Sequence, residues 1–176
     1  MNVPNILTVI RLILIPIFGY YLWNGEYYTA VFLFLLAGLT DVLDGFIARK
    51  YNMVTPWGKL ADPLADKLMQ ITALLILSLV KKLIPAELLA VVIAKEIFMG
   101  IGTILLYKQN NYVVSANWYG KLATIVFYFA IIMIIFKAPF STVFIFVAVL
   151  STLFAFVMYV RTFRQIKSMQ EKKADT

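Results

Sequence analysis

Four aspartates lie close together in a chain that is otherwise mostly apolar. The sequence is 62% hydrophobic and contains only nine acidic residues. Four of these nine fall in one short segment: Asp41, Asp44, Asp62 and Asp66. Acidic side chains are costly inside a membrane and are retained there mainly for function. The fold must therefore be an apolar scaffold that gathers these four carboxylates in one place.

The spacing of the aspartates predicts two neighbouring helices. Asp41 and Asp44 are three residues apart, so they share one face of a helix. Asp62 and Asp66 are four residues apart and share one face of the next helix. Residues 50–57, KYNMVTPW, predict the loop between the two helices. Helices joined in this way are antiparallel, and a rise of 1.5 Å per residue places the carboxylates roughly 6–12 Å below the loop.

The four carboxylates predict a site for divalent cations. Like charges at this depth repel one another unless a cation compensates them. Lys59 and Lys67 are near enough in sequence to supply part of that charge. Ligand sets made of oxygen alone suit magnesium, manganese or calcium, and two such ions form a site for phosphate or pyrophosphate. In the alternative interpretation, the aspartates are separate helix-capping and snorkelling charges.

Small residues are interleaved with these acids. Gly45 and Ala48 form a small-residue stripe on the first helix, and Gly58 lies one turn before Asp62 on the second. Such residues often allow close helix packing in membranes. They also leave bare backbone against which a ligand can lie. Their order among the aspartates favours the ligand interpretation.

Eight residues of this segment resemble the signature of the CDP-alcohol phosphatidyltransferase family at every position: Asp41, Asp44, Gly45, Ala48, Arg49, Gly58, Asp62 and Asp66. The resemblance extends to both sides of the signature. The segments Pro4-Asn5-Ile6-Leu7-Thr8-x-x-Arg11 and Asp62-Pro63-Leu64-Ala65-Asp66-Lys67 are similar to the phosphatidylglycerophosphate synthase branch of that family.

This resemblance implies a reaction in which an alcohol hydroxyl attacks the lipid-side phosphorus of CDP-diacylglycerol and CMP leaves. It implies two divalent ions, Mg²⁺ or Mn²⁺, held by Asp41, Asp44, Asp62 and Asp66, with Asp66 also the catalytic base. It further implies that the nucleotide contacts Thr8, Gly45, Ala48, Arg49 and Gly58. Asn5 and Arg11 would edge the same nucleotide and phosphate pocket.

The resemblance implies glycerol 3-phosphate as the acceptor. The residues expected to bind its phosphate are Lys121, Arg161 and Lys59. Two positions depart from the branch pattern, because Lys95 and Thr103 stand where these synthases usually carry arginine. Lysine keeps the charge of arginine but loses its two-pronged hydrogen bonding. A cardiolipin synthase of the same family, with phosphatidylglycerol as acceptor, is therefore the main alternative.

The composition excludes several other chemistries. The chain has no cysteine and no histidine, which removes serine–histidine triads, cysteine nucleophiles and most zinc sites. Its net charge of +7 suits contact with anionic membrane lipids or phosphate. We expect no nucleic-acid partner and no cleavable signal peptide.

Apolar runs predict an all-α integral membrane protein with six transmembrane helices and a short N-terminal interfacial helix. The interfacial helix covers residues 2–11 and leads into the spans. The first five are expected at residues 12–24, 29–49, 58–80, 85–107 and 118–136, and the sixth follows the turn at residues 137–139 and runs to about residue 159. The third span starts with Asp62 as its N-cap, or its backbone opens at Pro63. We expect one domain, residues 1–167, followed by a frayed basic tail, residues 168–176.

Lys95 and Glu96 lie near the middle of the predicted fourth span. Charged residues at this depth are candidates for function, although a tether between helices explains them equally simply. Adjacent residues do not face one another on a helix. We therefore expect each of the two to have a different partner.

Most basic residues outside the N-terminal segment fall on the side of the predicted fold that carries both termini: Arg49, Lys50, Lys59, Lys108, Lys121, Arg161, Arg164 and Lys167. Only Lys81, Lys82 and Lys137 are expected opposite. The positive-inside rule makes the richer side cytoplasmic. We expect a plasma-membrane protein whose acidic cluster opens to the cytoplasm.

Two other classes of protein deserve comparison with a membrane enzyme. A cation transporter would use the aspartates as a transit site, but the sequence has no paired broken helices or inverted repeats. A non-catalytic membrane interaction protein would retain its function after Asp66→Asn. The family resemblance favours the enzyme and implies a homodimer.

Overall fold

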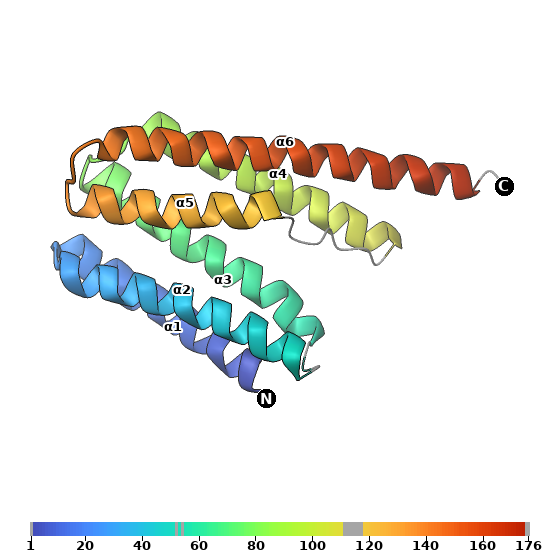
Figure 1. Ribbon diagram of the computed structural model, residues 1–176, viewed down its shortest axis with the longest axis horizontal. Helices are drawn as coiled ribbons and strands as arrows, with labels where there is room; N and C mark the ends of the chain where they lie inside the picture. Colours follow the sequence, from blue (N-terminus) through green and yellow to red (C-terminus); the bar gives the residue numbers. More distant parts are fainter. Residues whose placement is uncertain (1, 52, 54, 111–117, 175–176) are drawn as a thin grey trace. The chain divides into compact units, whose positions relative to one another are not determined.

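The computed structural model describes residues 2–51, 53, 55–110 and 118–174, with the backbone alone for residues 49, 56, 57, 59, 60, 102–110 and 165–174. Each regular element within these ranges is a helix (Figure 1). Five described segments are long and apolar enough to cross a membrane: Val3–Asn24, Tyr27–Ala48, Ala61–Val80, Trp118–Ile135 and Ser141–Arg164. A further helix, α4 (Ala86–Asn110), occupies the predicted fourth span. The prediction of an all-α integral membrane protein is confirmed.

The chain forms two compact units, Met1–Ala86 and Glu87–Thr176. The first unit contains α1 (Val3–Asn24), α2 (Tyr27–Lys50), α3 (Pro56–Leu75) and the π-helical segment η1 (Ile76–Val80). The second unit contains α4, together with α5 (Trp118–Ile135) and α6 (Ser141–Ala174). All four aspartates of the predicted site belong to the first unit.

In the first unit, α1 packs against both α2 and α3. Gly25 ends α1 at a φ of 84°, a conformation that favours glycine and lets the chain reverse into α2. The rings of Phe18 in α1 and Phe34 in α2 stack with centroids 5.3 Å apart, and both side chains are fully buried. This packing fixes the face of α2 that carries the first two aspartates.

The N-terminal segment is not a separate element. Residues 2–11, expected as an interfacial helix, run directly into the first span as the single helix α1. Pro4 lies in the first turn, where the backbone N–H that proline lacks would have no helical partner. Pro16 lies inside α1 without ending it, as prolines often do in membrane helices.

The start of α3 differs from the prediction that Asp62 is its N-cap. Thr55 occupies that position, and its hydroxyl oxygen accepts a hydrogen bond of 3.0 Å from the backbone N–H of Gly58. Pro56 follows as the first helical residue, where its fixed φ suits a helix. Because α3 begins at Pro56, Pro63 lies inside the helix. The side chain of Asp62 does not cap the helix and instead contacts Thr8 of α1.

In the second unit, α5 and α6 pack together as an antiparallel pair (Figure 1). The rings of Phe129 and Phe144 meet edge to face with centroids 5.2 Å apart. The Tyr159 hydroxyl of α6 donates to the Met99 carbonyl oxygen of α4 at 3.5 Å. The helix α6 continues to Ala174, through most of the segment expected to be a frayed tail.

Lys95 and Glu96 form an ion pair with each other, through Lys95 Nζ and Glu96 Oε1. Their side chains are only 10% and 11% exposed. The expectation that these neighbours do not face one another is wrong. Both side chains are long enough to bend together from adjacent positions, and low exposure strengthens the attraction between their charges.

Candidate active site

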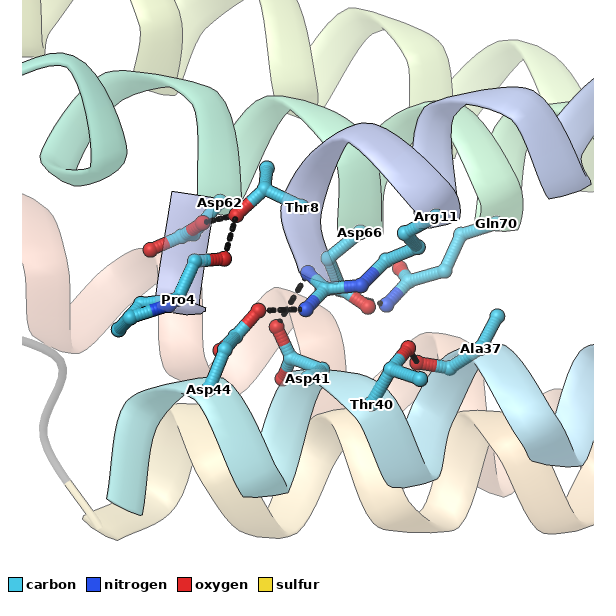
Figure 2. Close-up of polar contacts among 10 residues, drawn as sticks. All are labelled: Pro4, Thr8, Arg11, Ala37, Thr40, Asp41, Asp44, Asp62, Asp66 and Gln70. Atoms are coloured by element: carbon cyan, nitrogen blue, oxygen red, sulfur yellow. Dashed lines mark hydrogen bonds and ion pairs between the residues drawn. The ribbon is translucent and has the colours of Figure 1, made fainter. Parts of the chain in front are cut away.

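A buried arginine of α1 holds the two aspartates of α2. Arg11 Nη1 donates to Asp41 Oδ1 at 2.6 Å, and Arg11 Nη2 donates to Asp44 Oδ2 (Figure 2). The side chains of Arg11 and Asp44 are 1% and 2% exposed, whereas that of Asp41 is 42% exposed. One guanidinium therefore compensates the negative charges of a buried carboxylate, Asp44, and of a more exposed one, Asp41, which lies about one helical turn away. The family resemblance implies Arg11 only at the edge of the pocket, and the sequence suggests Lys59 and Lys67 for part of this charge, so the role of Arg11 is a finding of the structure.

Each of the two aspartates of α3 contacts a neutral polar side chain. The Thr8 hydroxyl contacts Asp62 Oδ1 and also lies 3.1 Å from the Pro4 carbonyl oxygen. A hydroxyl has one proton, and a carboxylate is the stronger acceptor, so donation to Asp62 is preferred. Gln70 Nε2 donates to Asp66 Oδ2 at 3.1 Å from the next turn of α3. Each carboxylate of the predicted cluster thus accepts at least one hydrogen bond.

The four aspartates are gathered on the inner side of the first unit. Figure 2 shows the carboxylates of α2 and α3 facing α1, around Thr8 and Arg11. This confirms the predicted sharing of helix faces within each pair. In this arrangement no three acidic side chains of the described residues are placed to hold one ion.

The chemistry of the donors nevertheless fits a divalent cation. All four side chains present hard oxygen atoms, which are the ligands that magnesium and manganese prefer. A cationic group already lies between Asp41 and Asp44, so the site accepts positive charge at that position. The donor set agrees with the divalent ions that the resemblance to the CDP-alcohol phosphatidyltransferases implies.

A second polar group lies where the first turns of α1 and α3 meet. The Thr55 hydroxyl donates to Asn5 Oδ1 at 2.9 Å. A Cβ added to Gly58 would lie 3.1 Å from Thr55 Oγ1, 3.3 Å from Asn5 Oδ1 and 3.6 Å from Asp62 Oδ2. Gly58 is therefore a close-contact position that faces polar atoms beside the carboxylates. This geometry suits both interpretations of the glycine, close packing and a bare backbone surface near a ligand.

The remaining predicted residues have different outcomes. Gly45 and Ala48 are half-buried on α2, near Asp44 in sequence. The side chains of Arg49, Lys59 and Thr103 lie outside the described residues. Lys121 of α5 and Arg161 of α6 belong to the second unit, where both are exposed.

Two site residues were missed or undervalued at the level of sequence. Gln70 follows Asp66 by four residues, so the helical period alone could have paired them. Arg11 precedes its partners by 30 and 33 residues, and no local pattern connects residues that far apart. Its buried position is a property of how α1 packs on α2.

Comparison with known proteins agrees with the eight-residue signature. The family model for CDP-alcohol phosphatidyltransferase matches residues 1–160. A relative from Aquifex aeolicus is 37% identical over 126 residues, which cover 71% of this chain and 70% of that protein. A relative from Bacillus subtilis is 38% identical over 138 residues and covers 70% of each chain. Both are named CDP-diacylglycerol–glycerol-3-phosphate 3-phosphatidyltransferase.

A third relative is named for a different activity. A probable cardiolipin synthase (CMP-forming) from Drosophila melanogaster is 36% identical over 109 residues. These residues cover 61% of this chain but only 34% of that protein. The names of the first two relatives contain the donor, CDP-diacylglycerol, and the name of the third contains the product, CMP. The chain belongs to the CDP-alcohol phosphatidyltransferase family.

Proposed function

We propose that this protein transfers the phosphatidyl group of CDP-diacylglycerol to glycerol 3-phosphate and releases CMP. The observation that carries the proposal is the gathering of the four signature aspartates around Arg11 and Thr8 of α1. The names of the Aquifex and Bacillus relatives support the same donor and acceptor. Membership of an enzyme family argues against the transporter and the non-catalytic interpretations.

The aspartates are the proposed metal ligands. Asp41, Asp44, Asp62 and Asp66 would hold two divalent ions, Mg²⁺ or Mn²⁺, through their carboxylate oxygens. Bound there, the ions would neutralise the charge of the pyrophosphate and of the departing CMP. The hydrogen bonds from Thr8 to Asp62 and from Gln70 to Asp66 orient these carboxylates.

Asp66 is the proposed base for the acceptor. Its carboxylate would take the proton of the attacking hydroxyl as the hydroxyl oxygen bonds to the lipid-side phosphorus. The bond between that phosphorus and the pyrophosphate bridging oxygen then breaks, and CMP carries away the electron pair. Gln70 fixes Oδ2 of Asp66 at 3.1 Å, which limits rotation of the base. Direct transfer is favoured, because the chain contains no histidine or cysteine and offers no obvious covalent nucleophile other than a carboxylate.

The substrates are assigned to two groups of residues. The proposed nucleotide contacts are Thr8, Gly45, Ala48, Arg49 and Gly58. The proposed contacts to the acceptor phosphate are Lys121, Arg161 and Lys59. Gly58 supports the first group, because a side chain at this position would enter the polar space beside Asp62.

The setting of the enzyme is part of the proposal. We assign the catalytic domain to residues 1–167, with residues 168–176 as an appended segment. The excess of basic residues on one side supports a plasma-membrane protein whose active site faces the cytoplasm. We also propose a homodimer, which analytical ultracentrifugation in detergent would test.

The decisive experiment is a CMP-release assay on purified protein. The protein receives CDP-diacylglycerol and Mg²⁺ or Mn²⁺, with either glycerol 3-phosphate or phosphatidylglycerol as acceptor. Turnover with glycerol 3-phosphate supports the proposed reaction. Turnover with phosphatidylglycerol alone refutes the proposed reaction in favour of cardiolipin synthesis, the activity for which the Drosophila relative is named. The Asp66→Asn variant serves as the inactive control.

A further inference from the structure

Arg11 is the most deeply buried charge of the described site. It is 0% exposed overall, and its guanidinium is shared between Asp41 Oδ1, at 2.6 Å, and Asp44 Oδ2. Its Nε is buried and has no hydrogen-bond partner among the residues that the structure describes. A structural arginine in a closed network usually satisfies all of its donors, because a buried unpaired donor is costly. Arg11 is therefore held by two carboxylates on one side and left unsatisfied on the other.

The same two carboxylates are proposed ligands of a divalent cation. A guanidinium that occupies Asp41 Oδ1 and Asp44 Oδ2 takes one oxygen atom of each carboxylate that the ion would otherwise use. If the ion and Arg11 were both held at these carboxylates, two cations would lie side by side in a poorly solvated place, where repulsion is strong. The two occupants therefore exclude each other to a large degree.

We propose that Arg11 is a built-in competitor of the divalent cation at Asp41 and Asp44, and thereby a positioning residue that sets the metal affinity of the site. This inference rests on the proposed metal-binding role of these aspartates. Arg11 neutralises them within the apolar scaffold, and the ion must displace its guanidinium in order to bind. The Nε–H of Arg11 is not used by Asp41 or Asp44, so it is available to form a new hydrogen bond when the guanidinium leaves these carboxylates.

The test is Mn²⁺ binding by the full chain in detergent. The protein is first stripped of metal with a chelator, and binding is then measured through the electron paramagnetic resonance signal of free Mn²⁺. A neighbouring charge changes the affinity of an acidic group for a proton by roughly one to three powers of ten. On that scale Arg11→Gln should bind Mn²⁺ at least ~10-fold more tightly than the wild type. Lys50→Gln removes one exposed charge near the same end of α2 and should change affinity by less than about twofold.

The two proposals fail in different ways. Mn²⁺ binding by the wild type that is lost in Asp41→Asn, together with equal or weaker binding by Arg11→Gln, overturns the competition and leaves the metal site intact. If neither the wild type nor Arg11→Gln binds Mn²⁺, the metal site and the competition are overturned together.

A second measurement separates competition from a purely structural role. Arg11→Gln should unfold at a lower temperature than the wild type in chelator, because the buried carboxylates lose their cation. Saturating Mn²⁺ should close most of this gap, whereas an unchanged gap would refute the competition. If Arg11→Gln does not fold, Arg11→Lys replaces it. Its ammonium lacks the two-pronged contact, so it should bind Mn²⁺ more tightly than the wild type, and equal or weaker binding overturns the proposal.

Discussion

Replacing either aspartate that pairs with Arg11 should destabilise the protein, but by unequal amounts. Asp44→Asn keeps the shape of the side chain and removes its charge. The Asp44 side chain is 2% exposed and that of Arg11 is 1% exposed. Breaking a buried ion pair by removing one partner costs about 3–5 kcal/mol, because the other charge stays buried. Asp41 still contacts Arg11, so the loss should lie near the lower end, about 3 kcal/mol.

Asp41→Asn is the matched comparison. Asp41 contacts the same guanidinium at 2.6 Å, but its side chain is 42% exposed. An ion pair with one partner this exposed is weaker than a fully buried one, and exposed pairs contribute about 0.2–1 kcal/mol. The loss should therefore be about 1 kcal/mol or less. Both variants remove a partner of the same cation, Arg11, and they differ in how deeply the removed carboxylate is buried.

The assay is reversible unfolding in mixed detergent micelles, followed by circular dichroism, with a chelator present throughout. Free energies of unfolding are compared for the wild type and both variants. The chelator removes differences in metal binding from the comparison. If Asp41→Asn lost as much stability as Asp44→Asn, burial would not govern the strength of these contacts. The reasoning that the Arg11–Asp44 pair is stronger than the Arg11–Asp41 pair would then be refuted.

Four further predictions concern single residues. Thr8→Val should cost about 1 kcal/mol in the same unfolding assay, because it removes the hydroxyl that contacts Asp62 and keeps the shape of the side chain. Gly58→Ala should cost about 1–2 kcal/mol through crowding against Thr55 and Asn5, and a gain in stability would refute the close contact. Asp66→Asn should abolish CMP release without changing the circular dichroism spectrum, and retained turnover would exclude this carboxylate as the base. Lys121→Ala should mainly raise the KM for glycerol 3-phosphate, and an unchanged KM would place the acceptor phosphate elsewhere.

The helical period explains what was predictable about the site. Asp41 and Asp44 share a face of α2, and Asp62 and Asp66 share a face of α3, as their spacings required. The apolar runs gave the spans because a membrane helix needs about 20 apolar residues. These signals are local, so they can be read directly from neighbouring positions in the chain.

The contacts that were not predicted depend on packing or on side-chain flexibility. The place of Arg11 between two aspartates of α2 follows from the way α1 packs on that helix, which periodicity does not specify. Lys95 and Glu96 pair although the helix directs them apart, because long side chains can bend. Thr55 caps α3 in place of Asp62, although a threonine directly before a proline is a recognisable start signal.

The distance in sequence between Arg11 and its partners has a consequence for biosynthesis. Arg11 is synthesised 30 residues before Asp41 and 33 before Asp44, so it first meets the lipid bilayer without its counter-charges. An arginine inserted alone costs about 2.5–3.5 kcal/mol at the centre of a span and less toward the end. Entry of α1 and α2 as a hairpin avoids this cost. A nascent chain that ends before Asp41 should accordingly insert its first helix less efficiently than the same chain with Arg11→Leu.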